Sequence, residues 1–410
     1  MSAAQGLPVG LGAPGGVPPL GINAKSSPAP SCEAFRVDPA TGEVTHDKPE
    51  YSPPKVRVER FVLQSVARSI LWGSRTAKCL RLVQAGRSEV EVWKSRTVEG
   101  AAVYGGLQTC GSVWACPVCA AKISERRRAE LAHAIGQHRQ EGGDVLLLTL
   151  TNPHKLGDSL AEAVERQARA MSRFNSTRQA AKLWESIGCV GTVRAWEVTH
   201  GANGWHPHFH LLLFVRSGLN LSDLRQRCYA LWANSCSLAG LPVPEFMVPY
   251  RFSNGAQKVF FGVDVQDGKA AAKYASKWGL ESEMTKGHIK HSRAVKGRTP
   301  FDLLRAKLHD DDRQAAALFK EFAECFKGRR QLVWSKGLKA RFAVADLNDE
   351  ELAAQIDDSA ACLGAISLEQ WRVILRLDLQ ADILELARHG WEPVQRLLAS
   401  LPPIPSGDTS

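Results

Sequence analysis

The chain has 410 residues, 44% hydrophobic and 23% charged, a composition typical of a globular protein with two or three packed units. Lys and Arg outnumber Asp and Glu by 52 to 42, and the net charge of +10 favours a polyanionic partner such as nucleic acid. No apolar run approaches the ~20 residues needed to cross a bilayer, and the N-terminus has no charged region followed by an apolar core. We therefore expect a cytoplasmic protein, and we exclude membrane proteins, secreted disulfide scaffolds and collagen-like chains.

The two ends of the chain differ in composition from its middle. Residues 1–54 hold ten of the 21 prolines and few large apolar side chains, so we expect them to be disordered. Residues 350–410 carry ten acids against four arginines, and apolar residues recur at helical spacing from Leu368 to Leu386, which predicts one amphipathic helix there. The expected regions are a Pro/Gly-rich tail (1–54), a cysteine segment with a basic helix (55–140), a core (141–300) and a mainly helical C-terminal region (301–410).

The middle of the chain predicts an alternation of strands and helices. Val145–Thr151 is a short apolar run that favours a buried strand, and Ser159 with Glu162 forms a capping box that begins a helix ending near Gly188. The further elements expected are strands at 190–199 and 206–215, a helix at 221–238, a strand at 258–265 and a helix at 268–279. Asn203-Gly204 predicts the hairpin turn between the second and third strands. The order β-α-β-β-α-β is that of the ferredoxin-like fold, so we expect an α+β protein with an antiparallel sheet.

Three histidines alternate along the third predicted strand. Because successive side chains of a strand point to opposite faces, His206, His208 and His210 project from one face. Neutral imidazole is the commonest metal ligand, so the pattern predicts a divalent-metal site; the alternative is a row of polar residues on a solvated sheet. An oxygen ligand usually completes a metal site for phosphate chemistry. Glu197, across the hairpin, is the best-placed carboxylate, and His206 competes with it for the third position.

Tyr274 lies in the short helix predicted after the last strand. Lys273 is its neighbour, and Lys277 is three residues further on, on the same helix face. Ammonium groups beside a phenol favour its phenolate form and can hold a phosphate. Residues 251–300 have ten Lys and Arg against four acids, which suits a DNA backbone. The alternative is a tyrosine that only packs or forms a hydrogen bond.

Three of the ten cysteines are clustered, and the Cys-Pro-Val-Cys segment at 116–119 is typical of a knuckle that presents two thiolates to one metal. With Cys110, this spacing predicts a structural zinc site that needs a fourth ligand. The candidates for that ligand are, in order of preference, Cys79, His133 and His138. The alternatives are a redox pair and buried thiols without a metal.

A run of positive charge follows the knuckle directly. Arg126, Arg127 and Arg128 lie on a helix that we expect to extend to about His138. Such a run contacts DNA or forms a solvated helix face, and the sequence alone leaves both interpretations open.

Together these motifs resemble the plasmid rolling-circle replication initiator (Rep) proteins of the HUH endonuclease superfamily. The resemblance covers roughly residues 75–280. It depends on four segments, which are Cys110–Ile123, Leu148–Thr151, His206–Phe214 and Lys273–Lys277. The resemblance implies a palm-like antiparallel sheet that carries the metal-binding histidines, preceded by the zinc-knuckle segment.

The resemblance also implies the chemistry. Mg²⁺ or Mn²⁺ on His208 and His210 would polarise the scissile phosphate of plasmid origin DNA, single-stranded or in a hairpin. Tyr274 would attack that phosphate and leave a 5′-phosphotyrosine and a free 3′-OH primer. The sequence has no P-loop, so unwinding must come from a host helicase. A host polymerase is the other expected partner, since the 3′-OH primes synthesis. Close relatives often have a glutamate four residues before the tyrosine, but this chain has Ala270 there, which puts the termination step in doubt; the nearest acids are Asp267 and Glu281.

Two other functions remain open at this point. The first is an HUH transposase or mobilisation relaxase, although the second tyrosine that some such transposases have four residues later is Trp278 in this chain. The second is a non-catalytic, zinc-containing DNA-binding protein. Metal-dependent nicking of single-stranded DNA would distinguish the enzymes from that protein.

Overall fold

A computed structural model describes residues 53–96, 102–245, 262–276 and 297–402, together with four short strands. These strands are β1 (Phe35–Val37), β2 (Val44–His46), β8 (Tyr250–Phe252) and β9 (Gly255–Gln257), which pair as two antiparallel hairpins. Residues 1–52 and 53–410 form separate units. Apart from β1 and β2, most of the segment expected to be disordered lies outside the described residues.

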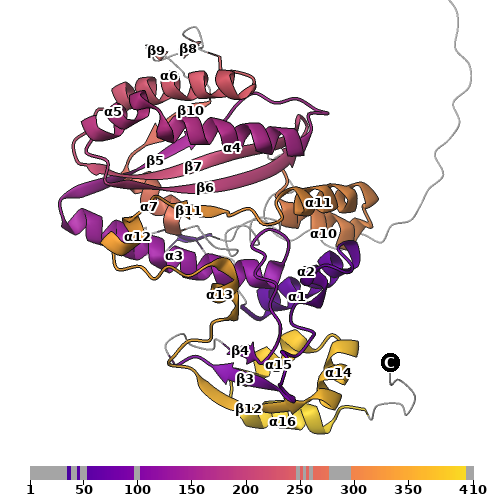
Figure 1. The fold of residues 1–410 in the computed structure, drawn as a ribbon. Helices are drawn as coiled ribbons and strands as arrows, with labels where there is room; N and C mark the ends of the chain where they lie inside the picture. Colours follow the sequence, from indigo (N-terminus) through magenta and orange to yellow (C-terminus); the bar gives the residue numbers. More distant parts are fainter. Residues whose placement is uncertain are drawn as a thin grey trace, which may run out of the picture. The chain divides into compact units, whose positions relative to one another are not determined.

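A five-stranded antiparallel sheet forms the centre of the second unit (Figure 1). Its strands are β5 (Gly143–Leu150), β6 (Gly191–Gly201), β7 (Gly204–Arg216), β10 (Val263–Gln266) and β11 (Leu332–Trp334), in the spatial order β10-β5-β7-β6-β11. The predicted turn at Asn203-Gly204 joins β6 to β7, and Gly204 has the left-handed φ of 82° that glycine adopts without strain. The strand from the C-terminal region, β11, was not predicted.

Helices cover both faces of this sheet (Figure 1). One face is covered by α4 (Leu160–Ser176) and α6 (Leu221–Ala239), which also contact α5 (Arg178–Ser186); the other is covered by α3 (Pro117–Gln140), α7 (Gly268–Ser276) and α12 (Leu338–Arg341). The predicted order β-α-β-β-α-β is confirmed in β5, α4, β6, β7, α6 and β10, and α7 follows. The β8–β9 hairpin between α6 and β10 was not predicted, and residues 258–261 of the strand expected at 258–265 lie outside the described residues. The single helix expected up to Gly188 is wrong, because Thr177 is extended and caps a new helix through Ala180 N.

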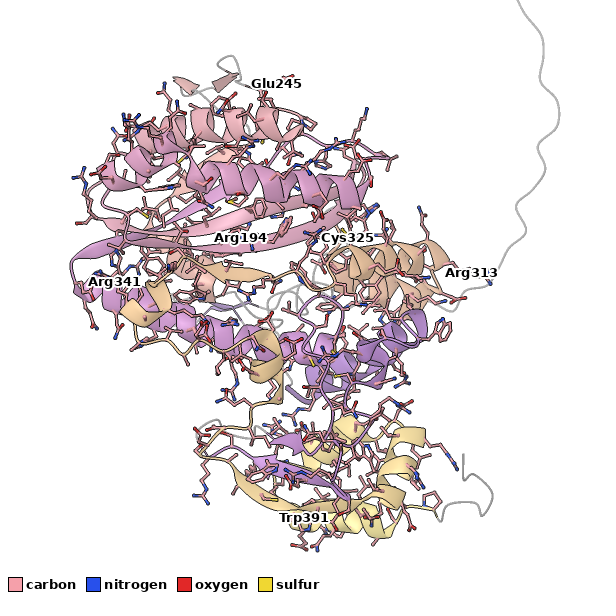
Figure 2. All side chains as sticks on the ribbon, in the orientation of Figure 1. Arg194, Glu245, Arg313, Cys325, Arg341 and Trp391 are labelled. Carbon is pink, nitrogen blue, oxygen red and sulfur yellow. The ribbon has the colours of Figure 1, made fainter. Side chains whose placement is uncertain are left out.

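The alternation of side chains along β7 separates two cores. Phe209, Leu211 and Leu213 pack under α4 and α6, whereas Leu212 and Phe214 pack against α3 and α7. The histidines occupy the start of the second set, on the α7 side. At the edge of the first core, the guanidinium of Arg194, labelled in Figure 2, lies 5.4 Å from the ring centre of Phe209.

A smaller sheet combines two distant parts of the chain. Its strands are β3 (Glu89–Lys94), β4 (Ala102–Gly105) and β12 (Ala361–Ser367), in the order β12-β3-β4. Three helices pack with it, namely α14 (Leu368–Arg376), α15 (Gln380–Ala387) and α16 (Trp391–Ala399). The single amphipathic helix expected from Leu368 to Leu386 is wrong: it divides into α14 and α15, and Asp378 between them has a left-handed φ of 52°.

The other helices of the described residues belong either to residues 53–78, before the cysteine knuckle, or to residues 300–354. They are α1 (Pro53–Ile70), α2 (Arg75–Lys78), α10 (Pro300–Asp310), α11 (Arg313–Cys325) and α13 (Asp349–Ala354). Among the described residues, no helix combines the length and the apolar character that a membrane span requires.

Candidate functional site

Two neighbouring strands bring a carboxylate and two imidazoles together. Glu197 of β6 is the register partner of His208 of β7, and His210 lies two residues further along the same face. The Nε2 atoms of His208 and His210 are 3.6 Å and 3.5 Å from Glu197 Oε2. One ligand atom from each residue lies within 4.8 Å of the others, so this group could bind a metal ion. The donor set of two nitrogens and one carboxylate suits a divalent cation.

The other ring nitrogens of both histidines have partners on the sheet. His210 Nδ1 lies 2.9 Å from Thr149 Oγ1 on β5, and His208 Nδ1 lies 3.2 Å from the carbonyl oxygen of His206. Such partners fix the ring orientation and leave Nε2 available for a metal. Burial by itself raises the pKa of Glu197, but His208 and His210 outweigh it and hold that pKa below its usual range. The carboxylate is therefore ionised, as a metal ligand must be.

His206 lies outside the group of three. Its ring stacks on His154, with centroids 4.5 Å apart and planes 10° apart, and its other neighbour is His208 at 4.8 Å. Burial, together with the imidazoles of His208 and His154, lowers the pKa of His206 to about 4, so the ring is neutral near pH 7. Of the two candidates for the third ligand, the structure places Glu197 in the group and leaves His206 beside it.

Tyr274 reaches this group from α7, which packs against β5. Its hydroxyl donates a hydrogen bond of 2.7 Å to Glu197 Oε1, and its ring centre is 4.8 Å from that of His210. The Asp267 carboxylate accepts a hydrogen bond of 3.0 Å from Ala270 N and so caps the first turn of α7. Lys273 is exposed on the same helix. Lys277 and Glu281 lie outside the described residues.

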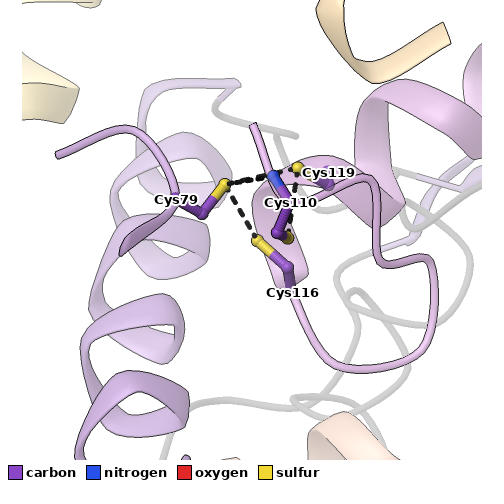
Figure 3. Close-up of side chains that lie close together, drawn as sticks. All are labelled: Cys79, Cys110, Cys116 and Cys119. Atoms are coloured by element: carbon purple, nitrogen blue, oxygen red, sulfur yellow. Dashed lines mark hydrogen bonds between the residues drawn. The ribbon is translucent and has the colours of Figure 1, made fainter. Parts of the chain in front are cut away.

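The four cysteines Cys79, Cys110, Cys116 and Cys119 converge in a second, buried group (Figure 3). The Sγ atom of Cys79 is 3.4 Å from that of Cys119 and 3.8 Å from that of Cys116, and the Cys110–Cys119 separation is 3.7 Å. Tetrahedral zinc with ~2.3 Å bonds to sulfur requires sulfur–sulfur separations of ~3.8 Å, so the four thiols fit such an ion. His133 and His138, the other two candidates for the fourth zinc ligand, form hydrogen bonds away from the cysteines. His133 Nε2 contacts the carbonyl oxygen of Phe342, and His138 Nε2 contacts that of Val215.

Hydrogen bonds to sulfur support the cysteine cluster. Cys110 N donates to Cys79 Sγ and Ser112 N donates to Cys110 Sγ, each at 3.4 Å, and the Gln64 amide donates to Cys116 Sγ at the same distance. The neighbouring thiols, Cys116 and Cys119 foremost, lower the pKa of Cys110 far below its usual range. The same contacts, with Cys110 as the largest cause, raise the pKa of Cys79 and of Cys116, so the cluster without an ion favours one thiolate, at Cys110. The thiolate is the form that binds a metal.

The three arginines of the basic run have different environments. Arg127 is buried, and its guanidinium contacts Glu130 at 2.9 Å, Asp349 at 3.2 Å and the carbonyl oxygen of Leu347 at 2.8 Å. These contacts attach α13 to α3, so this side chain is not presented to a DNA backbone. Arg128 pairs with Glu125 on the surface of α3, and Arg126 is half-buried.

Sequence reasoning missed several partners of the predicted site residues. Asp349 is separated from Arg127 by 222 positions, and no local pattern signals that pairing. His154 stacks on His206, and the sequence offered one signal for it: a polar Asn-Pro-His segment directly after a predicted strand. Thr149 belongs to the first motif, but its bond to His210 depends on the pairing of β5 with β7.

Comparison with known proteins identifies relatives of this chain. Residues 106–243 match the family model described as "Replication protein", a segment that includes the knuckle and the histidine strand and ends before Tyr274. "Protein rep" of Streptomyces lividans is 26% identical over 357 residues, 70% of this chain and 77% of the relative. "Protein rep" of Lentilactobacillus hilgardii is 34% identical over 104 residues, covering 25% and 32% of the two chains, respectively. "Neomycin resistance protein" of Streptomyces cyanogenus is 32% identical over 146 residues, covering 30% and 33%.

The chain thus spans about a third of two of these relatives and 77% of the other. No solved structure matches it. The resemblance to Rep proteins is confirmed by the family match and by relatives with that name.

Proposed function

We propose that this chain, a relative of the Rep proteins with a replication protein domain at residues 106–243, is a plasmid rolling-circle replication initiator that nicks and rejoins origin DNA. One observation carries the proposal: the hydroxyl of Tyr274 lies 2.7 Å from Glu197 Oε1, and Glu197 lies beside two histidine Nε2 atoms. A nucleophile and a candidate metal site thus meet on one face of an antiparallel sheet, as a palm-like HUH nuclease core requires.

Glu197, His208 and His210 are the residues that would hold a divalent cation, Mg²⁺ or Mn²⁺. When bound, such an ion supplies Lewis-acid polarisation of a phosphate oxygen and orients the DNA strand. Thr149 and the backbone of β7 keep the two imidazoles in the orientation that exposes Nε2. Neutral His206 supports His208 by stacking and adds no charge at neutral pH.

Tyr274 is the proposed nucleophile. Its oxygen forms a bond to the scissile phosphorus and gives up its proton, while the bond from phosphorus to the 3′ oxygen breaks and that oxygen takes up a proton. The DNA thus gains a free 3′-OH and the enzyme a 5′-phosphotyrosine, with no net change in protons. The hydrogen bond to Glu197 orients the phenol toward the site, and the packing of α7 on β5 sets the distance of the phenol from the sheet. Because no water enters this step, the 3′-OH can later reverse it and close the strand.

DNA is proposed to follow the positive charge near the site. Lys273 and Lys277 of the tyrosine segment, with Arg126 and Arg128 of α3, would neutralise phosphates. Arg127 is left out of this group because Glu130 and Asp349 neutralise it. Host helicase and polymerase would supply the unwinding and synthesis for which the sequence has no motif.

The four cysteines are proposed to hold a structural zinc ion. The knuckle precedes α3, and α3 packs on the same sheet as the histidines. Zinc at this point would fix the segment before the nuclease core to the basic helix, without supplying a group to the reaction.

Incubation with single-stranded oligonucleotides tests the proposal. Wild-type protein with Mn²⁺ should form a covalent adduct with origin oligonucleotides, and it should release a fragment with a 3′-OH. Origin affinity without any adduct would instead support the non-catalytic DNA-binding protein, whereas a preference for transposon ends or a transfer origin would support the transposase or relaxase.

A further inference from the structure

A glutamine lies in the middle of the apolar core between α4 and the sheet. Gln167 is 0% exposed, and its helix neighbours toward the core are apolar residues such as Val164 and Met171. Burial of an amide in such surroundings is unfavourable unless its hydrogen-bonding groups are satisfied. This amide is satisfied, and each of its partners belongs to a different strand or strand end.

The three hydrogen bonds of Gln167 reach three separate segments. Its Nε2 donates to Asn152 Oδ1, just after β5, and to the carbonyl oxygen of Pro207 on β7, both at 2.7 Å. Its Oε1 accepts a hydrogen bond of 3.1 Å from Trp196 Nε1 on β6. One side chain therefore connects β5, β6 and β7 from the face opposite the metal site.

Each contact lies close in sequence to a residue of the proposed site. Trp196 precedes Glu197, and Pro207 precedes His208. Asn152 belongs to the loop that carries His154, whose ring stacks on His206. Because side chains alternate along a strand, a group that holds Trp196 and Pro207 from the core side sets the position of their neighbours on the other side.

Pro207 lies just outside the part of β7 that pairs with β5. That pairing ends at Leu150 and Phe209, so Pro207 pairs only with Val198 of β6 and lies at a local sheet edge, where proline is tolerated and its carbonyl oxygen is available to Gln167. The strand carries His208 directly after this proline. The hydrogen bond from Gln167 holds the proline carbonyl from the core side.

We propose that Gln167 is a positioning residue of the metal site, which fixes the spacing of Glu197 and His208 through Trp196 and Pro207. The proposal rests on the proposed function, because it concerns the same metal site. Gln167 lies on the opposite face of the sheet and acts only through the strands.

Gln167→Met tests the proposal, since methionine has a similar length and none of the hydrogen bonds. Met171→Ala, one helical turn further along α4, is the matched control, because it removes buried apolar volume without touching these bonds. The readouts are thermal stability and Mn²⁺ affinity, the latter measured from free Mn²⁺ by electron paramagnetic resonance. Loss of a group that bonds a metal ligand typically weakens metal affinity about 10- to 100-fold. Gln167 bonds only to the neighbours of the proposed ligands, so we expect Gln167→Met to fall at the lower end, about 10-fold.

The control should lower the melting temperature and leave the Mn²⁺ dissociation constant unchanged. Equal Mn²⁺ affinity in wild type and Gln167→Met, or an equal loss in both variants, would overturn the positioning role. If Gln167→Met does not fold, Trp196→Phe removes one of the three hydrogen bonds and should weaken Mn²⁺ affinity a few-fold. An unchanged Mn²⁺ dissociation constant in Trp196→Phe would also overturn the positioning role. Failure of the proposed function is distinguishable, because wild type would then bind Mn²⁺ no better than His208→Ala.

Discussion

The hydroxyl of Tyr274 donates a hydrogen bond to Glu197, although 77 residues separate them in the sequence. The helix that carries the tyrosine and the hairpin that carries the glutamate meet only because α7 packs on the face of the sheet to which Glu197, His208 and His210 point. This arrangement makes separate predictions for the nucleophile, the metal ligands, their supporting residues and the cysteine cluster.

Tyr274→Phe should abolish nicking and adduct formation while DNA affinity stays within about twofold, because only the nucleophilic oxygen is removed. Tyr229→Phe is the matched control: that hydroxyl donates to the carbonyl oxygen of Pro244, away from the metal site. Cleavage of a labelled oligonucleotide and a filter-binding assay measure the two effects. Normal nicking by Tyr274→Phe would contradict the assignment.

His208→Ala and His210→Ala should each lose Mn²⁺ binding and nicking, since each removes one of the three proposed ligands. His206→Ala should be milder, because its ring stacks on His154 and lies outside the ligand group. Isothermal titration with Mn²⁺ ranks the three variants. If His206→Ala lost more Mn²⁺ affinity than the other two variants, His206 would have to be a metal ligand.

Thr149→Val should weaken Mn²⁺ affinity by about 10- to 100-fold, because His210 Nδ1 loses the partner that fixes its ring. Valine has nearly the shape of threonine, so the fold should persist. Thr192→Val, on β6 outside this group, is a control of the same kind. Equal affinities for the Thr149 and Thr192 variants would show that the hydroxyl has no role in metal binding.

Cys116→Ser or Cys119→Ser should release zinc and destabilise the segment that precedes the nuclease core, weakening origin recognition. In zinc-finger peptides such sites supply ~10–16 kcal/mol of apparent binding energy, which exceeds the stability of many domains. Short oligonucleotides should still be cleaved with Mn²⁺, because the proposed catalytic ligands are nitrogen and oxygen atoms. Elemental analysis should find about one zinc per chain, retained in mild chelator, and a zinc-free preparation with full origin affinity would disprove the site.

Arg127→Ala should act on stability, whereas Arg126→Ala should act on DNA. Removing the buried guanidinium leaves Asp349 and Glu130 without their partner, and breaking a buried ion pair typically costs about 3–5 kcal/mol. Arg126→Ala should weaken binding to all sequences and reduce the slope of log affinity against log salt by about 1. Chemical denaturation and salt-dependent binding measure these effects; a changed salt slope with normal stability in Arg127→Ala would reverse the assignment.

Local patterns predicted β5, α4, β6, β7, α6 and α7, because period-two alternation, a capping residue and an Asn-Gly turn act over a few residues. They did not predict α5 as a separate helix or the hairpin of β8 and β9. The same patterns could not reveal β11 or the sheet of β3, β4 and β12, since those strands pair across long stretches of chain. Cys79 could be named as a candidate ligand from its residue type, and the structure places it with the other three cysteines. The buried state of Arg127 and the three bonds of Gln167 depend on partners that only the folded chain brings near.

The central claim is that Tyr274 is the nucleophile beside the Glu197, His208 and His210 group. Wild-type protein incubated with a single-stranded origin oligonucleotide and Mn²⁺, then digested and mapped by mass spectrometry, tests this claim most directly. We expect a nucleotide adduct on the peptide that contains Tyr274, and none when the metal is chelated. An adduct on Tyr229 or Tyr250, or equal adduct formation without metal, would contradict it.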